Sequence, residues 1–192
     1  MTTSVLSLAL NPGLDVEALR RCYAQEGRVS IGEVLSNASA QALYEHLAAR
    51  DDWLQLINAG EKLFELSRSV RRDMPAQKSD ALDAAVYAGA RAGFQFRYET
   101  VRVPDGVAER ASSDDPLTDV ADFLSQGPAR DMLRTITGVE AIDFADAQAT
   151  AYAPGDFLTA HDDAVAGKKR HAAYVLGLRT RPKIRLSDFS QL

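Results

Sequence analysis

The sequence has a single cysteine, Cys22, which excludes an internal disulfide and is typical of a protein of the reducing cytoplasm. It has no apolar run of about 20 residues, the length that a helix needs to cross a bilayer, and no basic region before its first apolar stretch, so neither a membrane segment nor a signal peptide is predicted. It also lacks an excess of positive charge, because 22 Lys and Arg residues face 27 Asp and Glu residues. We therefore expect a cytoplasmic protein that binds neither nucleic acid nor membrane.

What is present is material for one domain with a core, since 46% of the 192 residues are hydrophobic. Helices are expected where apolar residues recur at helical spacing after a capping residue or a turn, in residues 15–27, 36–47, 79–93, 115–124 and 127–138. Strands are expected in residues 6–10, 28–35, 53–57, 63–66, 94–103, 147–152 and 172–178. The mixture predicts an α+β fold without an internal repeat.

Four polar features of the first two thirds of the chain receive local interpretations. Residues 104–116 are rich in Asp, Ser and Gly and are predicted to form a surface loop. Arginines cluster within residues 68–72 and are interpreted as a solvated helix end rather than an anion site. His46 is interpreted as a surface or boundary residue rather than a ligand. In residues 94–103 aromatic side chains alternate with polar ones, which predicts an amphipathic strand.

The stretch that carries chemistry is Tyr152-Ala-Pro-Gly-Asp-Phe-Leu-Thr-Ala-His161-Asp162-Asp163. Side chains of an extended segment alternate in direction, so His161 and Asp163 point the same way. One imidazole and one carboxylate can bind the same cation. A second imidazole would complete the two-His-one-carboxylate set of ligands, which leaves coordination positions open on iron(II). The expected elements are, in order, a strand, a turn at Pro154-Gly155, the ligand pair, a loop and a second strand. A jelly-roll barrel presents a metal site in this order. Taken alone, the spacing is also compatible with a polar loop end.

This stretch resembles the iron(II)- and 2-oxoglutarate-dependent dioxygenases, in their prolyl-hydroxylase branch. The residues that carry the resemblance lie within 147–178 and are Tyr152, Gly155, Phe157-Leu158, His161-Asp162-Asp163, Arg170, Tyr174-Val175-Leu176 and Leu178. The resemblance implies a partial double-stranded β-helix, or jelly roll, with supporting helices. It further implies that His161 and Asp163 bind Fe(II) and that Tyr152 lines the pocket of the co-substrate 2-oxoglutarate, with ascorbate as a candidate reductant. The implied substrate is a prolyl or other peptidyl residue, or a small molecule.

The sequence departs from the family pattern after the second expected strand. The family continues with a Trp, a Gly-Gly pair and strands that bear a distal His ligand and a basic residue for 2-oxoglutarate, whereas residues 179–192 contain no Trp, Gly or His. We therefore expect a single dioxygenase-like domain in residues 1–178 that lacks its C-terminal strands, then an atypical basic tail in residues 179–192, and impaired turnover. A solvated basic tail that ends a shorter fold is the alternative interpretation of this segment.

Two other functions are compatible with the same residues. A non-catalytic half-barrel interaction domain would bind a peptide or a partner at an open sheet edge, which a homodimer could also cover. A metal site unrelated to oxygenases would use His161, Asp163 and His171. We rank it last, because the strand expected over 172–178 would turn His171 away from the other two residues.

Overall fold

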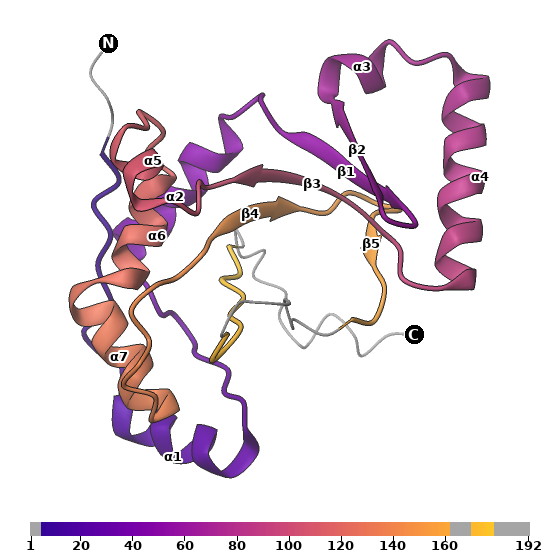
Figure 1. Cartoon of the computed structure of the whole chain (residues 1–192). Helices are drawn as coiled ribbons and strands as arrows, with labels where there is room; N and C mark the ends of the chain where they lie inside the picture. The colour runs from indigo at the N-terminus through magenta and orange to yellow at the C-terminus, as the bar shows by residue number, and fades with distance from the viewer. Residues whose placement is uncertain (1–4, 162–169, 179–192) are drawn as a thin grey trace, which may run out of the picture.

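The computed structural model of the chain describes residues 5–161 and 170–178, so Asp163 and the basic tail lie outside the described residues. The elements in chain order are α1 (Val16–Glu26), α2 (Asn37–Ala48), β1 (Leu54–Ala59), β2 (Lys62–Ser67), α3 (Arg68–Arg72), α4 (Ala76–Ala92), β3 (Phe96–Arg102), α5 (Val107–Ala111), α6 (Thr118–Ser125), α7 (Gly127–Thr137), β4 (Gln148–Ala151) and β5 (Phe157–Leu158). Helices and an open antiparallel sheet are combined, which confirms the α+β class (Figure 1).

The sheet has the strand order β2-β1-β3-β4, and β5 also pairs with β3. All of these pairs are antiparallel; Leu56 lies opposite Tyr98, and Phe96 lies opposite Leu158. The predicted hairpin is confirmed as β1 and β2, whose turn contains Gly60 at φ 60°. β3 is therefore the central strand, and each of its two faces meets a different set of side chains.

Local capping explains where several helices begin and end. The Asp15 side chain accepts a hydrogen bond from the backbone N–H of Ala18 at the start of α1, which ends at Gly27 in the left-handed conformation. Ser36 caps α2, and Gly138 ends α7 in the same way as Gly27 ends α1. The predicted start of α4 at Ser79 is wrong: the helix begins at Ala76, directly after Pro75 at the N-cap position, and no side chain caps it.

Three predicted strands and one predicted loop are corrected by the structure. Residues 6–10 and 28–35 form only one isolated bridge, between Leu10 and Leu35, and Glu33 interrupts the extended backbone with φ 52°. Residues 172–178 have no strand pairing; Leu176 and Leu178 instead pack their side chains against the core. The predicted loop over 104–116 contains the short helix α5.

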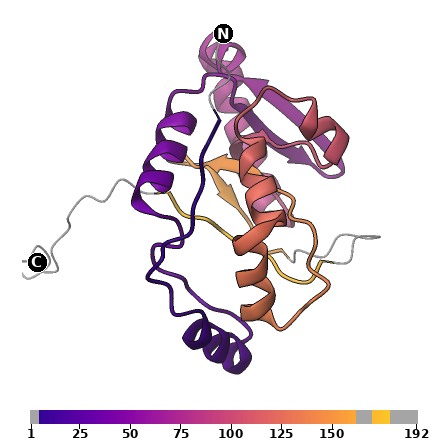
Figure 2. The same ribbon diagram turned by 90° about the vertical axis from the view of Figure 1, so that its left-hand side faces the viewer.

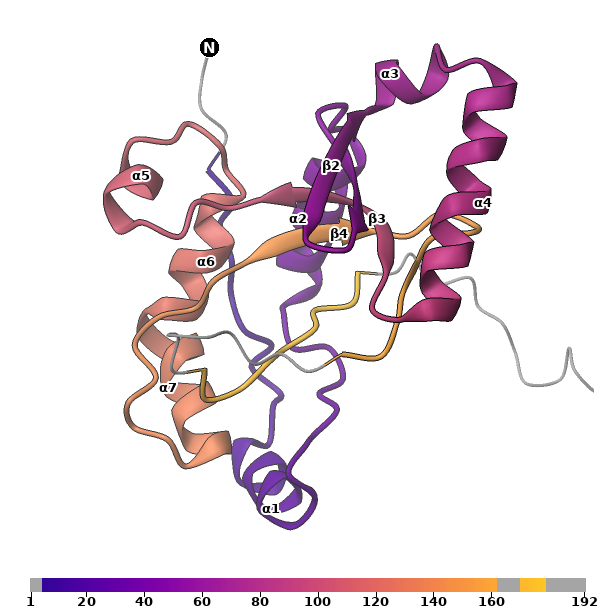
Figure 3. The same cartoon turned by 45° about the vertical axis from the view of Figure 1, so that its right-hand side comes forward.

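The apolar core lies where α2 and α6 meet the C-terminal end of β3. Its buried members are Leu6, Leu35, Leu43, Trp53, Val101, Val103, Leu117, Val120 and Ala121. α1 packs against α7 beyond this core (Figure 2). At the opposite end of the molecule, α3 and α4 lie beside the β1–β2 hairpin (Figure 3). Within the described ranges, none of the helices is both long enough and apolar enough to span a membrane.

Candidate functional site

A row of aromatic rings runs along one face of β3. Ring centroids lie 5.6 Å apart between Phe94 and Phe96, 5.4 Å between Phe96 and Tyr98, and 5.5 Å between Tyr98 and Tyr152. The imidazole of His161 lies 6.0 Å from the ring of Phe94 at the other end. These separations are those of interacting aromatic pairs. The structure thus places the two described site residues, Tyr152 and His161, at opposite ends of one aromatic row.

The segment after β5 holds His161 in a defined orientation. The backbone N–H of Thr159 donates to the carbonyl of Gln95, and the N–H of Gln95 donates to Oγ1 of Thr159, both at 3.0 Å. Nδ1 of His161 lies 3.1 Å from the carbonyl oxygen of Thr159. A carbonyl oxygen only accepts, so the ring donates from Nδ1 in this contact, and in the tautomer with the proton on Nδ1 the lone pair is on Nε2. Metal-binding histidines have this arrangement, with the second ring nitrogen bonded to a carbonyl or carboxylate.

Tyr152 presents a protonated phenol beside the row. Partial burial, followed by the proximity of Tyr98 and Asp156, raises the pKa of Tyr152 above its ordinary value. The hydroxyl therefore remains a hydrogen-bond donor at neutral pH. A neutral donor of this kind is suited to a carboxylate such as that of 2-oxoglutarate.

The described residues fit an iron centre only in part. His161 has a suitable tautomer, whereas Asp163 lies outside the described residues. Across residues 5–161 and 170–178 no three His, Cys, Asp or Glu side chains are grouped closely enough to hold a metal ion. Nε2 of His46 lies 3.2 Å from Nη1 of Arg50 and 3.7 Å from a carboxylate oxygen of Asp115, so His46 is the boundary residue that its sequence position predicts. His171 is exposed, and the strand expected to turn it away is absent.

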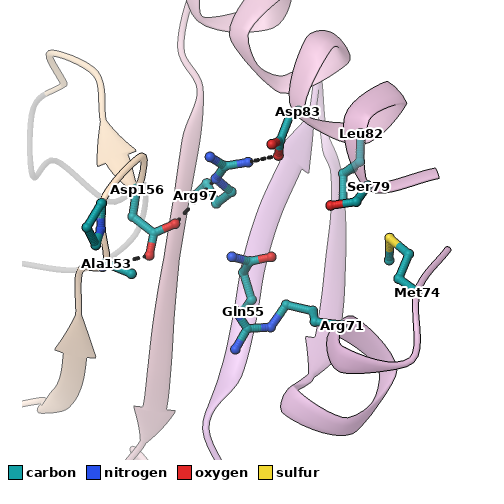
Figure 4. Close-up of a pocket in the computed structure, with 10 residues that line it drawn as sticks. Gln55, Arg71, Met74, Ser79, Leu82, Asp83, Arg97, Ala153 and Asp156 are labelled. Carbon is teal, nitrogen blue, oxygen red and sulfur yellow. Dashed lines mark hydrogen bonds and ion pairs between the residues drawn. The ribbon is translucent and has the colours of Figure 1, made fainter. Parts of the chain in front are cut away.

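The opposite face of β3 is polar and buried, which the amphipathic pattern did not predict. Arg97, 7% exposed, donates from Nη1 to Asp83 of α4 at 2.5 Å, and its Nε lies 3.3 Å from a carboxylate oxygen of Asp156 (Figure 4). Its Nη2 donates to the hydroxyl of Tyr87 at 3.1 Å and to the carbonyl of Gly155 at 2.7 Å. One guanidinium therefore joins β3, α4 and the turn between β4 and β5.

Glu99 is the second charged group on this buried face. Arg68 donates to both of its carboxylate oxygens, at 3.0 Å and 2.7 Å, and Arg71 donates to one of them. The hydrogen bond from Arg68, with the nearby charge of Arg71, holds the pKa of Glu99 below its ordinary value despite burial. The prediction of a solvated helix end for residues 68–72 holds for the exposed Arg68 but not for the partly buried Arg71, and it missed that both arginines bind Glu99, which lies 28 or more residues away on β3.

A cavity of about 240 Å³ lies between α4, the β1 and β3 strands and the β4–β5 turn. Its lining includes Arg71, Ser79, Asp83, Arg97 and Asp156 (Figure 4). Arg97 and Tyr98 point to opposite faces of β3, so this cavity is separate from the aromatic row. The charges of the two arginines are matched by the two carboxylates, which gives the cavity no excess of either sign.

Sequence reasoning missed the residues of this network. The alternation predicts an amphipathic strand but does not place Arg97 and Glu99 in a buried layer, and Asp156 lies in the motif stretch without a predicted role. A usable signal was present, because the neighbouring strand also carries a polar residue, Gln55, at the position opposite Glu99. Two adjacent strands with polar residues indicate a buried polar layer when helices cover them.

Comparison of the chain with protein-family models, with curated proteins and with solved structures gave no match. The dioxygenase resemblance therefore stays a prediction from the motif residues.

Proposed function

We propose that the chain is an Fe(II)- and 2-oxoglutarate-dependent dioxygenase domain of the prolyl-hydroxylase type. His161 and Asp163 hold the iron, and the substrate is a prolyl or other peptidyl residue, or a small molecule. The observation that carries the proposal is the hydrogen bond between Nδ1 of His161 and the carbonyl of Thr159, which gives the imidazole the tautomer of a metal ligand. The open antiparallel sheet supports the partial jelly roll in this proposal.

The roles of the residues follow from their positions. Bound iron and 2-oxoglutarate together supply the oxidising chemistry. His161 contributes one ligand, and Tyr152 offers a protonated hydroxyl from the far end of the aromatic row to orient the co-substrate. The described residues provide no further imidazole within a metal cluster. We therefore expect the 192-residue chain to retain iron weakly and to turn over slowly.

The test is an anaerobic Fe(II) titration of the purified chain with and without 2-oxoglutarate. The proposal predicts a weak visible charge-transfer band that requires both components and is lost in His161→Ala. His171→Ala is the matched control, because it removes another exposed imidazole of the same region. Loss of the band in His171→Ala as well would favour the metal site built from His161, Asp163 and His171. Absence of the band in the unmodified chain would contradict the proposal.

A second candidate function is a non-catalytic interaction domain, and one observation favours it. In the described part of the chain, β2 pairs on one side only, with β1, and its Leu63 and Phe64 are 52% and 48% exposed. An extended peptide or a second copy of the chain could add a strand at this edge. This function predicts that the chain associates as its concentration rises, which sedimentation velocity measures. Leu63→Lys should abolish this association and leave iron binding unchanged. Association that is the same in Leu63→Lys would exclude this edge.

A further inference from the structure

We propose that Arg97 is the positioning residue of the iron site: it fastens the turn before β5 to α4 and thereby sets the direction of the His161 imidazole. The part of this inference that concerns metal affinity rests on the proposed function. The part that concerns the imidazole stands on the contacts alone. No atom of Arg97 needs to touch the metal or a substrate for this role.

The first step is a pair of hydrogen bonds to the carbonyl of Gly155, which we call the clamp. This carbonyl accepts hydrogen bonds from Nη2 of Arg97 at 2.7 Å and from the hydroxyl of Tyr87 at 3.1 Å. Gly155 has φ +91°, and a Cβ built there would lie 2.9 Å from the Tyr87 oxygen and 3.2 Å from Nη2 of Arg97. Glycine adopts this backbone conformation without strain and leaves room for this close approach, whereas an added Cβ would require the Tyr87 hydroxyl to shift. The Gly155 position in the motif is thus explained by the clamp.

The second step is the closure of the turn by Asp156. One of its carboxylate oxygens lies 3.3 Å from Nε of Arg97, and the other accepts the backbone N–H of Ala153 at 3.0 Å. The N–H of Asp156 in turn donates to the carbonyl of Ala153 at 2.9 Å. The Asp156 side chain is only 5% exposed. Arg97 therefore holds a closed turn rather than a loose loop.

The third step carries the constraint to His161. Phe157 stacks on the ring of Tyr87, with centroids 5.7 Å apart. β5 then pairs with β3 over two residues only, Phe157 opposite Arg97 and Leu158 opposite Phe96. Thr159 is bonded to Gln95, and its carbonyl accepts from Nδ1 of His161. A two-residue strand is a weak anchor by itself, so the clamp before it stabilises the whole segment up to the imidazole.

An arginine is suited to this role and a lysine is not. The planar guanidinium offers five donors in a fixed fork, which here donates hydrogen bonds to Asp83, Tyr87 and Gly155 and lies in ion-pair contact with Asp156. A lysine keeps the charge but loses the fork. An apolar residue of similar volume would serve stability as well as a buried ion pair does. The buried charge of Arg97 is therefore consistent with a role in fixing the geometry of the turn before β5 rather than in raising the stability of the fold.

The chain contains a matched control for Arg97. Arg110 of α5 is 5% exposed, its Nε lies 3.1 Å from a carboxylate oxygen of Asp122, and its guanidinium lies 4.8 Å from the centroid of the Phe144 ring. Arg97 shares these three features, with Tyr87 as its aromatic partner at 5.2 Å, and in addition donates hydrogen bonds to Asp83, Tyr87 and Gly155, whereas Nε and Nη1 of Arg110 have no hydrogen-bond partner. Arg110 is not among the contacts that hold the turn or His161. Arg110→Lys therefore reports the general cost of altering a buried arginine.

The experiment compares the full chain with Arg97→Lys, Arg110→Lys and Asp156→Asn. Side-chain nitrogen shifts from long-range ¹H–¹⁵N NMR report the tautomer of His161 without any metal. We expect Nδ1–H in the unmodified chain and in Arg110→Lys, and a shift toward Nε2–H in Arg97→Lys and Asp156→Asn. Calorimetric Co²⁺ titration should show a dissociation constant raised about tenfold in Arg97→Lys and unchanged in Arg110→Lys. Asp156→Asn keeps the test decisive if Arg97→Lys does not fold.

The outcomes separate the two proposals. A changed His161 tautomer in Arg97→Lys, together with no Co²⁺ binding by the unmodified chain, overturns the iron site and keeps the positioning role. An unchanged tautomer and unchanged Co²⁺ affinity in both clamp variants overturn the positioning role and keep the iron site. Equal changes in Arg110→Lys and Arg97→Lys also overturn it, because the effect would then be one of general stability.

Discussion

Residues 95–103, which are β3 with one residue added at each end, are buried to a similar degree in both halves but by different chemistry. Val101 and Val103, 8% and 3% exposed, enter the apolar core between α2 and α6. Gln95, Arg97 and Glu99, 4%, 7% and 9% exposed, lie in the polar network beside α3 and α4. Apolar contacts depend on area and are not directional, whereas hydrogen bonds and ion pairs set distances and angles. The candidate site is attached to the polar half of the strand, where hydrogen bonds and ion pairs fix distances and angles.

The largest expected effect comes from the apolar half. Leu43→Ala removes a side chain that is 2% exposed within the core, and we expect it to lower the free energy of unfolding by about 2–5 kcal/mol. The measurement is urea denaturation. Leu63→Ala is the control, because the same truncation at a 52% exposed position on β2 should cost far less. Equal losses would mean that the core does not dominate stability.

In the polar half, the corresponding substitution is Glu99→Gln, which removes the carboxylate that pairs with Arg68 and Arg71. It leaves Arg68 and Arg71 facing a neutral amide, and we expect a loss of about 2 kcal/mol, below the range for fully buried pairs because Arg68 is 42% exposed. Asp73→Asn, which removes an exposed ion pair with Arg72, should change unfolding by less than about 0.5 kcal/mol. A Glu99→Gln loss as small as that of the control would show that the network contributes direction without stability.

The pH dependence of unfolding sharpens the same comparison. The pKa of Glu99 in the folded chain is lowered, first by the hydrogen bond from Arg68. The unfolded chain therefore binds more protons as pH falls, and the stability that this carboxylate contributes is present above its unfolded pKa of about 4.3. This contribution is lost as pH falls through the folded pKa. The stability difference between the unmodified chain and Glu99→Gln should shrink below pH of about 4, whereas the Leu43→Ala difference should persist.

The smallest expected effect separates backbone strain from close packing in the polar half. Gly155→Ala and Gly27→Ala both place a side chain at positive φ, but only Gly155 has atoms within 4 Å of the added Cβ. We expect Gly155→Ala to cost about 1 kcal/mol more than Gly27→Ala. Paired urea melts measure this difference. Equal costs would mean that Tyr87 and Arg97 move aside freely.

The success of prediction differed between local and distant interactions. The ends of α1 follow from Asp15 and Gly27, because a cap bonds residues three or four positions away. The extended pattern of residues 172–178 predicted a strand that is absent, because an extended pattern does not reveal whether a partner strand is available. Residue type and spacing pointed to His161, and the family resemblance pointed to Tyr152, while the aromatic row that lies between them required the pairing of β3 with its neighbours.

By itself the sequence determined the helix caps, the β1–β2 hairpin, the mixed composition and the residues that a metal site could use. Only the tertiary structure decided that the polar face of β3 turns inward and that Arg97 reaches both Asp83 and Asp156. These partners lie 14 and 59 positions away along the chain. A buried charge is tolerated only where distant chain segments bring compensating groups to it, and no local pattern contains that information.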